Sequence, residues 1–212
     1  LVGAGRTELL QTLFGITPAV GGTLKLDGNK ILPRRPLEAI MAGIALAPED
    51  RKQHGLVSQM SVRENSSLAR LRIDQKAGMI DFTAETNVAN EAVEKMDIKT
   101  PHLEQVIQYL SGGNQQKVVL GKWLAMNPRL LLLDEPTRGI DVGSKQEIYK
   151  LMEELAASGV AILFVSSEME EVLGMADRAL VMHEGAITGE LSRDQLSEET
   201  IMQLATGNKA AA

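Results

Sequence analysis

The chain has 212 residues, a hydrophobic content of 44% and a charged content of 24%, which is typical of a soluble globular protein of one domain or two small lobes. Its formal net charge of -6 repels phosphate backbones, and aromatic residues, at 3%, leave few rings to stack on bases. Both features argue against a nucleic acid partner. With 0 cysteines the chain has no disulfides or thiolate metal sites, and it fits a reducing compartment.

Apolar stretches in this sequence are short. LLLL at 130–133 and VAILFV at 160–165 fall well below the ~20 residues that a membrane-spanning helix needs. The first residues do not resemble a signal peptide, because Arg6 and Glu8 interrupt them. We therefore expect a chain that does not span a membrane and that begins inside a domain.

The first half of the chain predicts a short helix, two strands and a helical region. Residues 7–15 place apolar side chains at helical spacing. GGTLKLDG alternates apolar and polar residues and predicts a short strand that leads into a turn at Asp27-Gly28. Residues 44–50 predict a buried strand that runs into a loop. Residues 56–110 are mostly helical in pattern, and we expect them to form a small separate lobe.

In the second half, predicted helices alternate with apolar strands. The helices are expected at 114–125, 144–159 and 169–177, and the buried strands at 130–134 and 160–167. Unbroken apolar strands separated by helices indicate a parallel sheet with both faces covered, which is an α/β core. RALVMHEGAITGEL predicts a closing hairpin with Glu184-Gly185 at its turn. A short helix and a flexible tail over 205–212 should follow.

A glycine-rich segment precedes the first predicted helix. In a phosphate-binding loop, glycines let successive backbone N–H groups point at one anion, and the positive end of the next helix adds to the same site. Gly3 and Gly5 fit this pattern, and Thr7 stands at its magnesium-binding hydroxyl. Arg6 replaces the usual lysine, and the first glycine of the pattern would lie just before Leu1. A short glycine stretch before a helix is also typical of an ordinary tight connection, so this motif alone leaves both interpretations open.

The segment RLLLLDEPT, residues 129–137, is an apolar strand that ends in two adjacent carboxylates. Open α/β sheets bind ligands at the ends of their parallel strands. Asp134 would hold Mg²⁺ there, and Glu135 would orient and polarise an attacking water. The alternative is an exposed acidic turn made rigid by Pro136. A phosphate loop and an acidic strand end in one chain support each other.

The segment YLSGGNQQKVVLGKWL, residues 109–124, places Ser111, Gly112 and Gly113 directly before a helix. It offers a second anion site of the same physical type as the phosphate loop. One nucleotide does not need two such loops, so we expect ATP to be closed between two domains that supply one loop each. The alternative is a capped turn, which is the usual meaning of Ser-Gly-Gly.

These motifs occur in the order found in ATP-binding cassette (ABC) ATPases, which the chain resembles over nearly its whole length. APEDRK at 47–52 and DEPTRGIDVGSKQEIY at 134–149 further resemble the second cassette of tandem-cassette ATPases that drive bacterial import of ribose, arabinose, galactose and related sugars. The resemblance implies a parallel sheet of the P-loop NTPase type, flanked by helices. This core would comprise residues 1–55 and 111–212, with N-terminal strands missing. Residues 56–110 would be a small helical subdomain next to the ABC signature.

The resemblance also assigns roles residue by residue. Asp134 and Thr7 correspond to the magnesium ligands, and Glu135 to the catalytic carboxylate. Glu49 is the counterpart of a glutamine in the loop that faces the permease, and Ser167 stands where a histidine is usual. The implied nucleotide-binding residues are Gly3, Ala4, Gly5, Arg6, Thr7, Glu8, Ser111, Gly112, Gly113, Asn114 and Asp141. The last of them belongs to the loop that crosses to the partner cassette.

Three of these positions depart from the family pattern, and all three belong to one half-site. Arg6 keeps its charge, but its planar fork cannot slip between β- and γ-oxygens as an ammonium does. Ionised Glu49 only accepts hydrogen bonds and adds negative charge near phosphate and metal. Ser167 cannot act as an imidazole donor, and losing one such donor costs on the order of 3 kcal/mol, or about a hundredfold in rate. We therefore predict a slow or regulatory half-site, and an intact signature that completes a competent site on the partner.

By resemblance, the ligands are ATP and Mg²⁺. The implied partners are an N-terminal cassette of the same polypeptide or a dimer mate, an integral membrane sugar permease and, through it, a periplasmic sugar-binding protein. The expected location is peripheral, at the cytoplasmic face of the bacterial inner membrane, with the fragment itself soluble.

Three functional hypotheses follow. The favoured one is an ATPase that couples ATP binding and hydrolysis to monosaccharide import. A second is a non-hydrolysing, regulatory nucleotide-binding module that completes its neighbour's site. A third, an ABC protein acting on ribosomes or DNA, would require a basic surface or a long coiled-coil insertion, and the sequence has neither.

Overall fold

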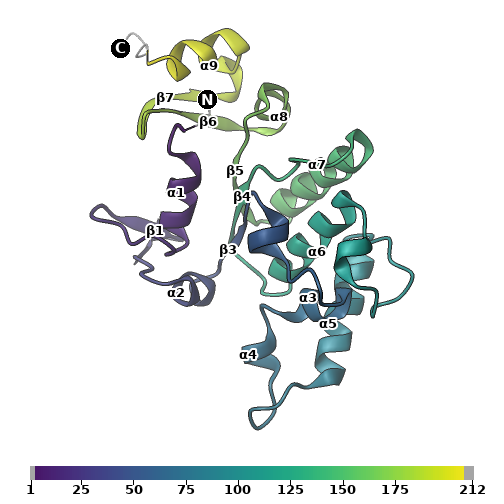
Figure 1. The fold of residues 1–212 in the computed structure, drawn as a ribbon. Helices are drawn as coiled ribbons and strands as arrows, with labels where there is room; N and C mark the ends of the chain where they lie inside the picture. The colour runs from purple at the N-terminus through teal and green to yellow at the C-terminus, as the bar shows by residue number, and fades with distance from the viewer. Residues whose placement is uncertain (1–2, 208–212) are drawn as a thin grey trace. The chain divides into compact units, whose positions relative to one another are not determined.

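The computed structural model describes residues 3–207, and the chain divides into two compact units. One unit combines Leu1–Pro36 with Val165–Ala212, and the other is Leu37–Phe164 (Figure 1). These bounds are not those of the expected division, in which residues 56–110 form a subdomain of their own. That subdomain stays a prediction.

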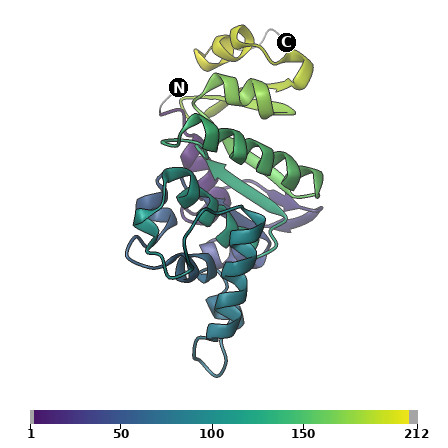
Figure 2. The same ribbon diagram turned by 90° about the vertical axis from the view of Figure 1, so that its right-hand side faces the viewer.

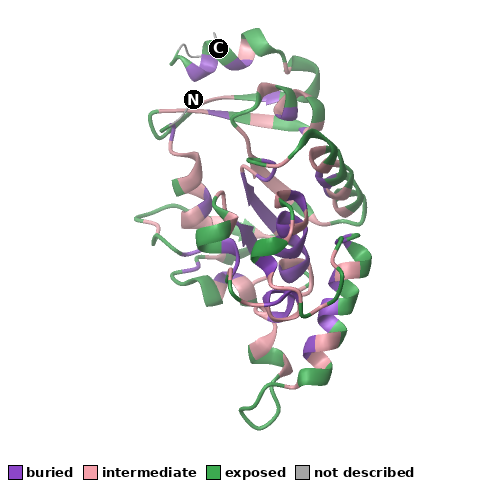
Figure 3. Cartoon of the chain, turned by 45° about the vertical axis from the view of Figure 1, so that its right-hand side comes forward, coloured by how far each residue is buried: buried purple, intermediate pink, exposed green. Residues whose placement is uncertain are grey.

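A three-stranded sheet forms the centre of the Leu37–Phe164 unit, with the strand order β3-β4-β5. Strands β3 (Ile44–Ala47) and β4 (Leu130–Asp134) pair in parallel, so that Leu46 lies opposite Leu132. The apolar run of β4 is completely buried at Leu131, Leu132 and Leu133, and Figure 3 shows β3 and β4 as a purple centre. The structure confirms both strands and the parallel α/β core predicted from their apolar sequences.

The third strand, β5 (Ala161–Val165), is only half-buried, and its first residue is exposed. It is the last strand in the order of this sheet. The expectation of a fully buried strand is therefore wrong, because an apolar run identifies a strand without fixing its place in the sheet.

Helix α6 (Gly112–Leu124) is the central helix of this unit and buries Val118, Val119 and Leu120. It begins two residues before the predicted helix because Ser111 caps it, with its Oγ accepting from the Asn114 N–H. Helices α3 and α5, β3 and α7 all contact α6. The other helical segments of this unit are α2 (Pro36–Met41), η1 (Arg51–Gly55), α3 (Val62–Ser67), α4 (Leu71–Asp74), α5 (Phe82–Lys95), η2 (Ile107–Tyr109) and α7 (Val142–Ala157).

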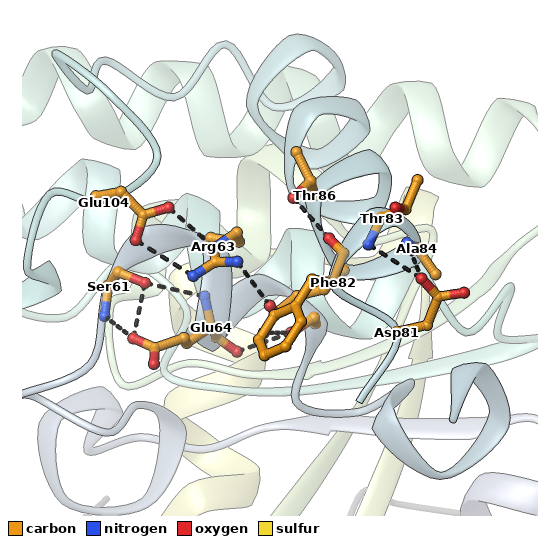
Figure 4. A network of polar contacts seen from close by, with 11 residues as sticks. Ser61, Arg63, Glu64, Asp81, Phe82, Thr83, Ala84, Thr86 and Glu104 are labelled. Carbon is orange, nitrogen blue, oxygen red and sulfur yellow. Dashed lines mark hydrogen bonds and ion pairs between the residues drawn. The ribbon is translucent and has the colours of Figure 1, made fainter. Parts of the chain in front are cut away.

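A polar network joins α3 to α5 and to the segment before the signature (Figure 4). The Arg63 guanidinium pairs with Glu85 Oε2 at 3.0 Å and with Glu104 Oε1 at 3.0 Å. Ser61 and Glu64 form a capping box at the start of α3. Since Glu85 is buried, removing Arg63 would leave an uncompensated charge inside the unit, at a cost of about 3–5 kcal/mol. Helices α3 and α5 of the predicted helical region thus pack against each other and against α6. In Figure 2, α5 extends down to the loop that joins it to α4.

The unit that contains both ends of the chain is built from helices and two hairpins. Its elements are α1 (Arg6–Leu13), β1 (Leu24–Leu26), β2 (Asn29–Ile31), α8 (Met169–Met175), β6 (Arg178–His183), β7 (Ala186–Ser192), η3 (Arg193–Gln195) and α9 (Glu198–Ala205). Strands β6 and β7 are antiparallel and turn at Glu184-Gly185, as predicted. The predicted strand before Asp27-Gly28 is β1, and the turn leads into a second strand, β2.

Side chains of β6, β7 and α9 form a small apolar cluster that includes Val181, Leu191 and Leu204. Ala205, the first residue of the predicted tail, is the last residue of α9 and is buried, while residues 208–212 lie outside the described residues. Between residues 3 and 207, no helix combines the length and the apolar character needed to cross a membrane.

Candidate nucleotide-binding site

The glycine-rich segment at the start of the chain forms a loop that leads into α1. Gly3 and Gly5 have φ angles of 82° and 91°, in the left-handed region that favours glycine. Helix α1 begins at Arg6, and its N-cap residue Gly5 provides no side-chain hydrogen bond. The first N–H groups of a helix need a partner, and an anion satisfies them well. This geometry fits the predicted phosphate loop.

The turn of the β6–β7 hairpin holds this loop from one side. The Gly185 N–H donates to the Ala4 carbonyl at 3.0 Å. A Cβ on Gly5 would lie 3.0 Å from Gly185 Cα, so even alanine is too large there. The sequence predicted both the loop and the hairpin turn, but no motif linked the two. Gly185 is therefore a supporting residue of the candidate site that the sequence did not reveal.

Arg6, one of the three positions that depart from the family pattern, contacts the residue directly before a second such position, Ser167. Arg6 Nη1 donates to the Ser166 carbonyl at 2.5 Å, directly before the exposed Ser167. Ser166 Oγ in turn donates to Glu171 Oε2 at 2.6 Å and accepts from the Glu168 N–H at 3.0 Å. The cation of the phosphate loop is thus engaged by the segment that follows β5. A lysine could not make this planar, directed contact in the same way.

The two predicted carboxylates follow one another at the carboxyl end of β4. Asp134 is the last residue of the strand and is 4% exposed. Glu135 is half-buried with a φ of 48°, and its carbonyl accepts from the Arg138 N–H at 3.1 Å. A left-handed φ at a residue other than glycine is unfavourable and persists where its surroundings impose it. The surroundings therefore hold the turn directly after the strand in this conformation.

The expected magnesium ligands suit that ion by their chemistry. Residues 3–207 contain no group of three or more His, Cys, Asp or Glu side chains that could hold a metal. Mg²⁺ does not need such a cage, because it keeps several waters and usually binds one or two carboxylates together with substrate phosphates. The Asp134 carboxylate and the Thr7 hydroxyl provide the hard oxygen atoms that it prefers. Each of these side chains is therefore chemically suited to Mg²⁺, and neither is of the cysteine or histidine type usual in structural zinc sites.

The signature residues form the first turn of α6 and its cap. Ser111 Oγ accepts from Asn114 Nδ2 at 2.9 Å and from the Asn114 N–H at 3.4 Å. Asn114 Oδ1 accepts from the Lys99 N–H at 2.7 Å, so this side chain is fixed at both ends. A Cβ on Gly112 would lie 2.7 Å from Arg51 Nη2, and one on Gly113 would collide with Ser144. Both glycines are thus required by close packing within the unit.

Asp141 caps helix α7. Its carboxylate accepts from the Ser144 N–H at 3.0 Å and from Ser144 Oγ at 2.8 Å. The backbone hydrogen bond from Ser144, followed by the side-chain hydrogen bond, lowers the pKa of Asp141. The carboxylate is therefore charged at neutral pH, and it is exposed. Its expected role towards a partner cassette is compatible with this position but stays a prediction.

Glu49 has a counter-ion that the sequence did not reveal. It forms an ion pair with Arg138, in the loop between Glu135 and Asp141. The expectation that Glu49 simply adds negative charge near phosphate overlooked this partner. Arg51, two residues further on, donates to the carbonyls of Arg138 and Gly139 at 2.9 and 3.1 Å. The APEDRK segment contained both residues, but only the structure shows what they contact.

The candidate residues are distributed over the two units. The phosphate loop and Ser167 belong to the unit with both chain ends. Glu49, the two strand-end carboxylates, the signature and Asp141 belong to the Leu37–Phe164 unit. Within the latter, hydrogen bonds of Arg51 connect the Glu49 segment to the loop after β4 and to α6.

The family model of ABC transporters matches residues 2–138, which is more than half of the chain. The chain belongs to the ABC transporter family. Nearly all of the chain aligns with several curated relatives, but the chain spans only about two fifths of their length. It is 50% identical over 211 residues to the ribose import ATP-binding protein RbsA 1 of Streptomyces coelicolor, covering 100% of this chain and 42% of that protein.

Relatives named for other sugars match the cassette equally well. The arabinose import ATP-binding protein AraG of Pseudomonas syringae is 53% identical over 206 residues, covering 97% of this chain and 41% of that protein. The xylose import ATP-binding protein XylG of Geobacillus kaustophilus is 52% identical over 210 residues, covering 99% of this chain and 42% of that protein. Identity at this level does not separate the three named sugars.

Solved ABC structures have the same fold. The ADP conformation of the ATP-binding cassette MJ1267 superimposes with a TM-score of 0.76 at 23% identity, covering 97% of this chain and 85% of that chain. The cassette MJ0796, bound to ADP and Pi in a dimeric post-hydrolysis state, gives a TM-score of 0.75 at 20% identity, covering 91% of this chain and 82% of that chain. The predicted α/β P-loop NTPase fold is confirmed.

Proposed function

We propose that the cassette binds ATP and takes part in ATP-driven import of a monosaccharide through a membrane permease. The observation that carries this proposal is the loop Gly3–Gly5, which leads into α1 without a side-chain cap and suits a phosphate group. Relatives named for ribose, arabinose and xylose import support the substrate class.

The proposed chemistry assigns distinct tasks to the two units. In one, the N–H groups at the start of α1 bind phosphate oxygens, while Arg6 adds positive charge. In the other, the carboxylate of Glu135 orients the attacking water and takes up its proton. Thr7 and Asp134 would hold Mg²⁺, which neutralises negative charge that develops during phosphoryl transfer.

We further propose that the half-site owned by this phosphate loop hydrolyses ATP slowly or regulates the partner site. Arg6 supports this proposal, because one of its donors is engaged with the Ser166 carbonyl rather than free for phosphate. Ser167 lacks an imidazole that could stabilise the γ-phosphate in the transition state. Glu49 gives this proposal weaker support, because the ion pair with Arg138 offsets the negative charge that Glu49 would add near the phosphates.

The signature would then act on a second nucleotide. We propose that Ser111–Asn114 and Asp141 face the ATP of an N-terminal cassette in the same polypeptide, or of a dimer mate. The first turn of α6 would offer its remaining helix N–H groups to that nucleotide, and Ser111 and Lys99 fix the geometry of this turn. The assembly would be peripheral to the cytoplasmic face of the inner membrane, through the permease, and a periplasmic sugar-binding protein would deliver the substrate.

Nucleotide binding and turnover, measured separately, test this proposal. The chain alone should bind ATP with Mg²⁺ and hydrolyse it at least about a hundredfold more slowly than the full-length protein, as expected when a transition-state donor is missing. Turnover by the chain alone at the full-length rate would contradict the slow half-site. Failure to bind ATP in both proteins would contradict the nucleotide-binding function itself.

A non-hydrolysing, regulatory module is the second candidate function. It is favoured by the same contact between Arg6 and Ser166. Single-turnover measurements on the full-length protein separate the two: the slow half-site releases a second phosphate with delay, whereas the regulatory module releases only one per pair of bound nucleotides.

A further inference from the structure

Arg51 is the first residue of η1 and is half-buried between three segments of the Leu37–Phe164 unit. Its guanidinium donates through Nη1 to the Arg138 carbonyl at 2.9 Å and through Nη2 to the Gly139 carbonyl at 3.1 Å. Nε approaches Gln115 Oε1 at 3.5 Å. The two terminal nitrogens thus hold consecutive carbonyls of one loop, as the fixed fork of a guanidinium allows.

The loop that Arg51 holds is the one that separates the two proposed functional carboxylates after β4. Glu135 precedes it, and Asp141 follows it at the cap of α7. Two hydrogen bonds to consecutive carbonyls fix the direction of the peptide plane between them. The orientation of this loop therefore depends on the Glu49–Arg51 segment as well as on its own sequence.

The third contact of Arg51 reaches the signature helix. Gln115 lies in the first turns of α6, and its Nε2 donates to the Ile107 and Leu110 carbonyls at 3.2 Å each. Gly112 approaches so closely that a Cβ there would lie 2.7 Å from Arg51 Nη2 and 3.1 Å from the Gly139 carbonyl oxygen. Signature, guanidinium and loop are thus packed without intervening space.

Two further contacts tie the same segment to the same neighbours. Before Arg51, Glu49 pairs with the Arg138 side chain. At the other end of η1, the Gly55 carbonyl accepts from the buried Lys122 Nζ at 2.5 Å, in the last turn of α6. The segment from Glu49 to Gly55 is therefore attached to the loop after β4 and to both ends of the signature helix.

Neutral oxygen atoms, rather than a directly bound carboxylate, accept the hydrogen bonds of the Arg51 guanidinium. Its burial lowers the pKa of Arg51, and the charge of Asp50 acts in the opposite direction. Hydrogen bonds from a cation to carbonyl oxygens are short-range and directional. Arg51 is suited to fix a geometry rather than to neutralise a charge.

We propose that Arg51 is a positioning residue for ATP hydrolysis: it sets the loop between Glu135 and Asp141 and locks it to the signature turn. This inference rests on the proposed function for its catalytic consequence, but the positioning itself can be measured without ATP.

The experiment compares Arg51→Lys with wild type and with Arg129→Lys in the full-length protein. Arg129 is a matched control in the same unit, because its Nη2 also donates to a backbone carbonyl, that of Ala42, at 2.8 Å. Lysine keeps the charge but cannot hold two carbonyls and Gln115 together. Backbone hydrogen exchange is followed by mass spectrometry for peptides that cover residues 137–142, and steady-state ATP turnover is measured on the same samples.

The proposal predicts that Arg51→Lys raises exchange in residues 137–142 about tenfold and lowers kcat severalfold, with KM for ATP and the exchange of β3 and β4 unchanged. Arg129→Lys should leave hydrogen exchange in residues 137–142 at the wild-type level. Unchanged exchange in Arg51→Lys would overturn the proposal, and so would a uniform rise across the unit. Faster loop exchange with unchanged kcat would overturn its catalytic part. If wild type shows no turnover, the proposed function fails, while exchange still decides whether Arg51 positions the loop.

Discussion

Helices α1 and α6 both follow a glycine-containing loop, but their first turns are held in different ways. The N-cap of α1 is Gly5, which has a left-handed φ and offers no side-chain hydrogen bond. The N-cap of α6 is Ser111, whose hydroxyl accepts from Asn114, and Asn114 is fixed in turn by the Lys99 N–H. One helix start has glycine where the other has a complete side-chain cap.

This difference separates a helix start that suits a bound anion from one that the chain itself fixes. At α1 the nearest cation, Arg6, contacts the Ser166 carbonyl. At α6 the cap, Gln115 and Arg51 form continuous contacts with the loop after β4. We propose that the positions that depart from the family pattern impair the first site, whereas the second keeps the pattern together with its supporting contacts.

The largest effect should come from a methyl group at the signature. Gly112→Ala places a Cβ within contact of Arg51 and the Gly139 carbonyl, so it should displace the loop after β4. We expect ATP turnover by the full-length protein to fall about a hundredfold, as when a well-placed transition-state donor is lost. Gly174→Ala is the control, since a Cβ there meets nothing within 4 Å. Equal turnover in both variants would show that close packing at Gly112 is not needed for ATP turnover.

A smaller effect, in the opposite direction, is expected at the phosphate loop. Arg6→Lys combined with Ser167→His should raise ATP hydrolysis by the isolated chain about tenfold, because a compact ammonium and an imidazole donor return to the site. Each single variant should gain less than the pair. A double variant no faster than wild type would show that these two positions do not limit the half-site.

Lys122, whose Nζ donates to the Gly55 carbonyl from the last turn of α6, makes the stability of the protein depend on pH. Burial lowers the pKa of Lys122 from 10.5 to about 8, so the unfolded chain binds more protons than the folded one between these pH values. The free energy of unfolding should therefore rise from pH 8 towards 10.5, by up to about 1.4 kcal/mol per pH unit. Urea denaturation at several pH values, compared with Lys122→Met, measures this term. Parallel curves for the two proteins would contradict it.

The smallest effect concerns the cap itself. Ser111→Ala should lower the free energy of unfolding by about 1 kcal/mol, because the Asn114 N–H loses its acceptor. Thermal denaturation with and without nucleotide measures this loss. A loss below about 0.3 kcal/mol would indicate that Lys99 and Arg51, rather than the cap, hold the first turn of α6.

The sequence predicted those parts of the fold that are determined by the residues of one continuous segment. The four leucines of β4 predicted a buried strand, the turn Glu184-Gly185 predicted its hairpin, and the order of the motifs predicted the family. The half-burial of β5 could not be read from VAILFV, since its place in the sheet depends on other strands. Sequence motifs show which residues are present but not which residues they contact.

The candidate site shows the same limit. The contact between Arg6 and Ser166 joins positions 160 residues apart in the chain, and the contacts of Arg51 span 64 to 88 residues. Glu49 and its partner Arg138 lie in two different motifs, and no local spacing links one motif to the other. Such long-range pairs are not encoded in local spacing.

The central claim is that this chain contributes more through its signature than through its own phosphate loop. Turnover by the full-length protein with Glu135→Gln, measured beside turnover with Ser111→Arg, tests that claim most directly, provided that both variants still bind ATP. We predict that Glu135→Gln keeps most of the wild-type rate and that Ser111→Arg loses about a hundredfold. A rate that collapses with Glu135→Gln and survives Ser111→Arg would contradict the account.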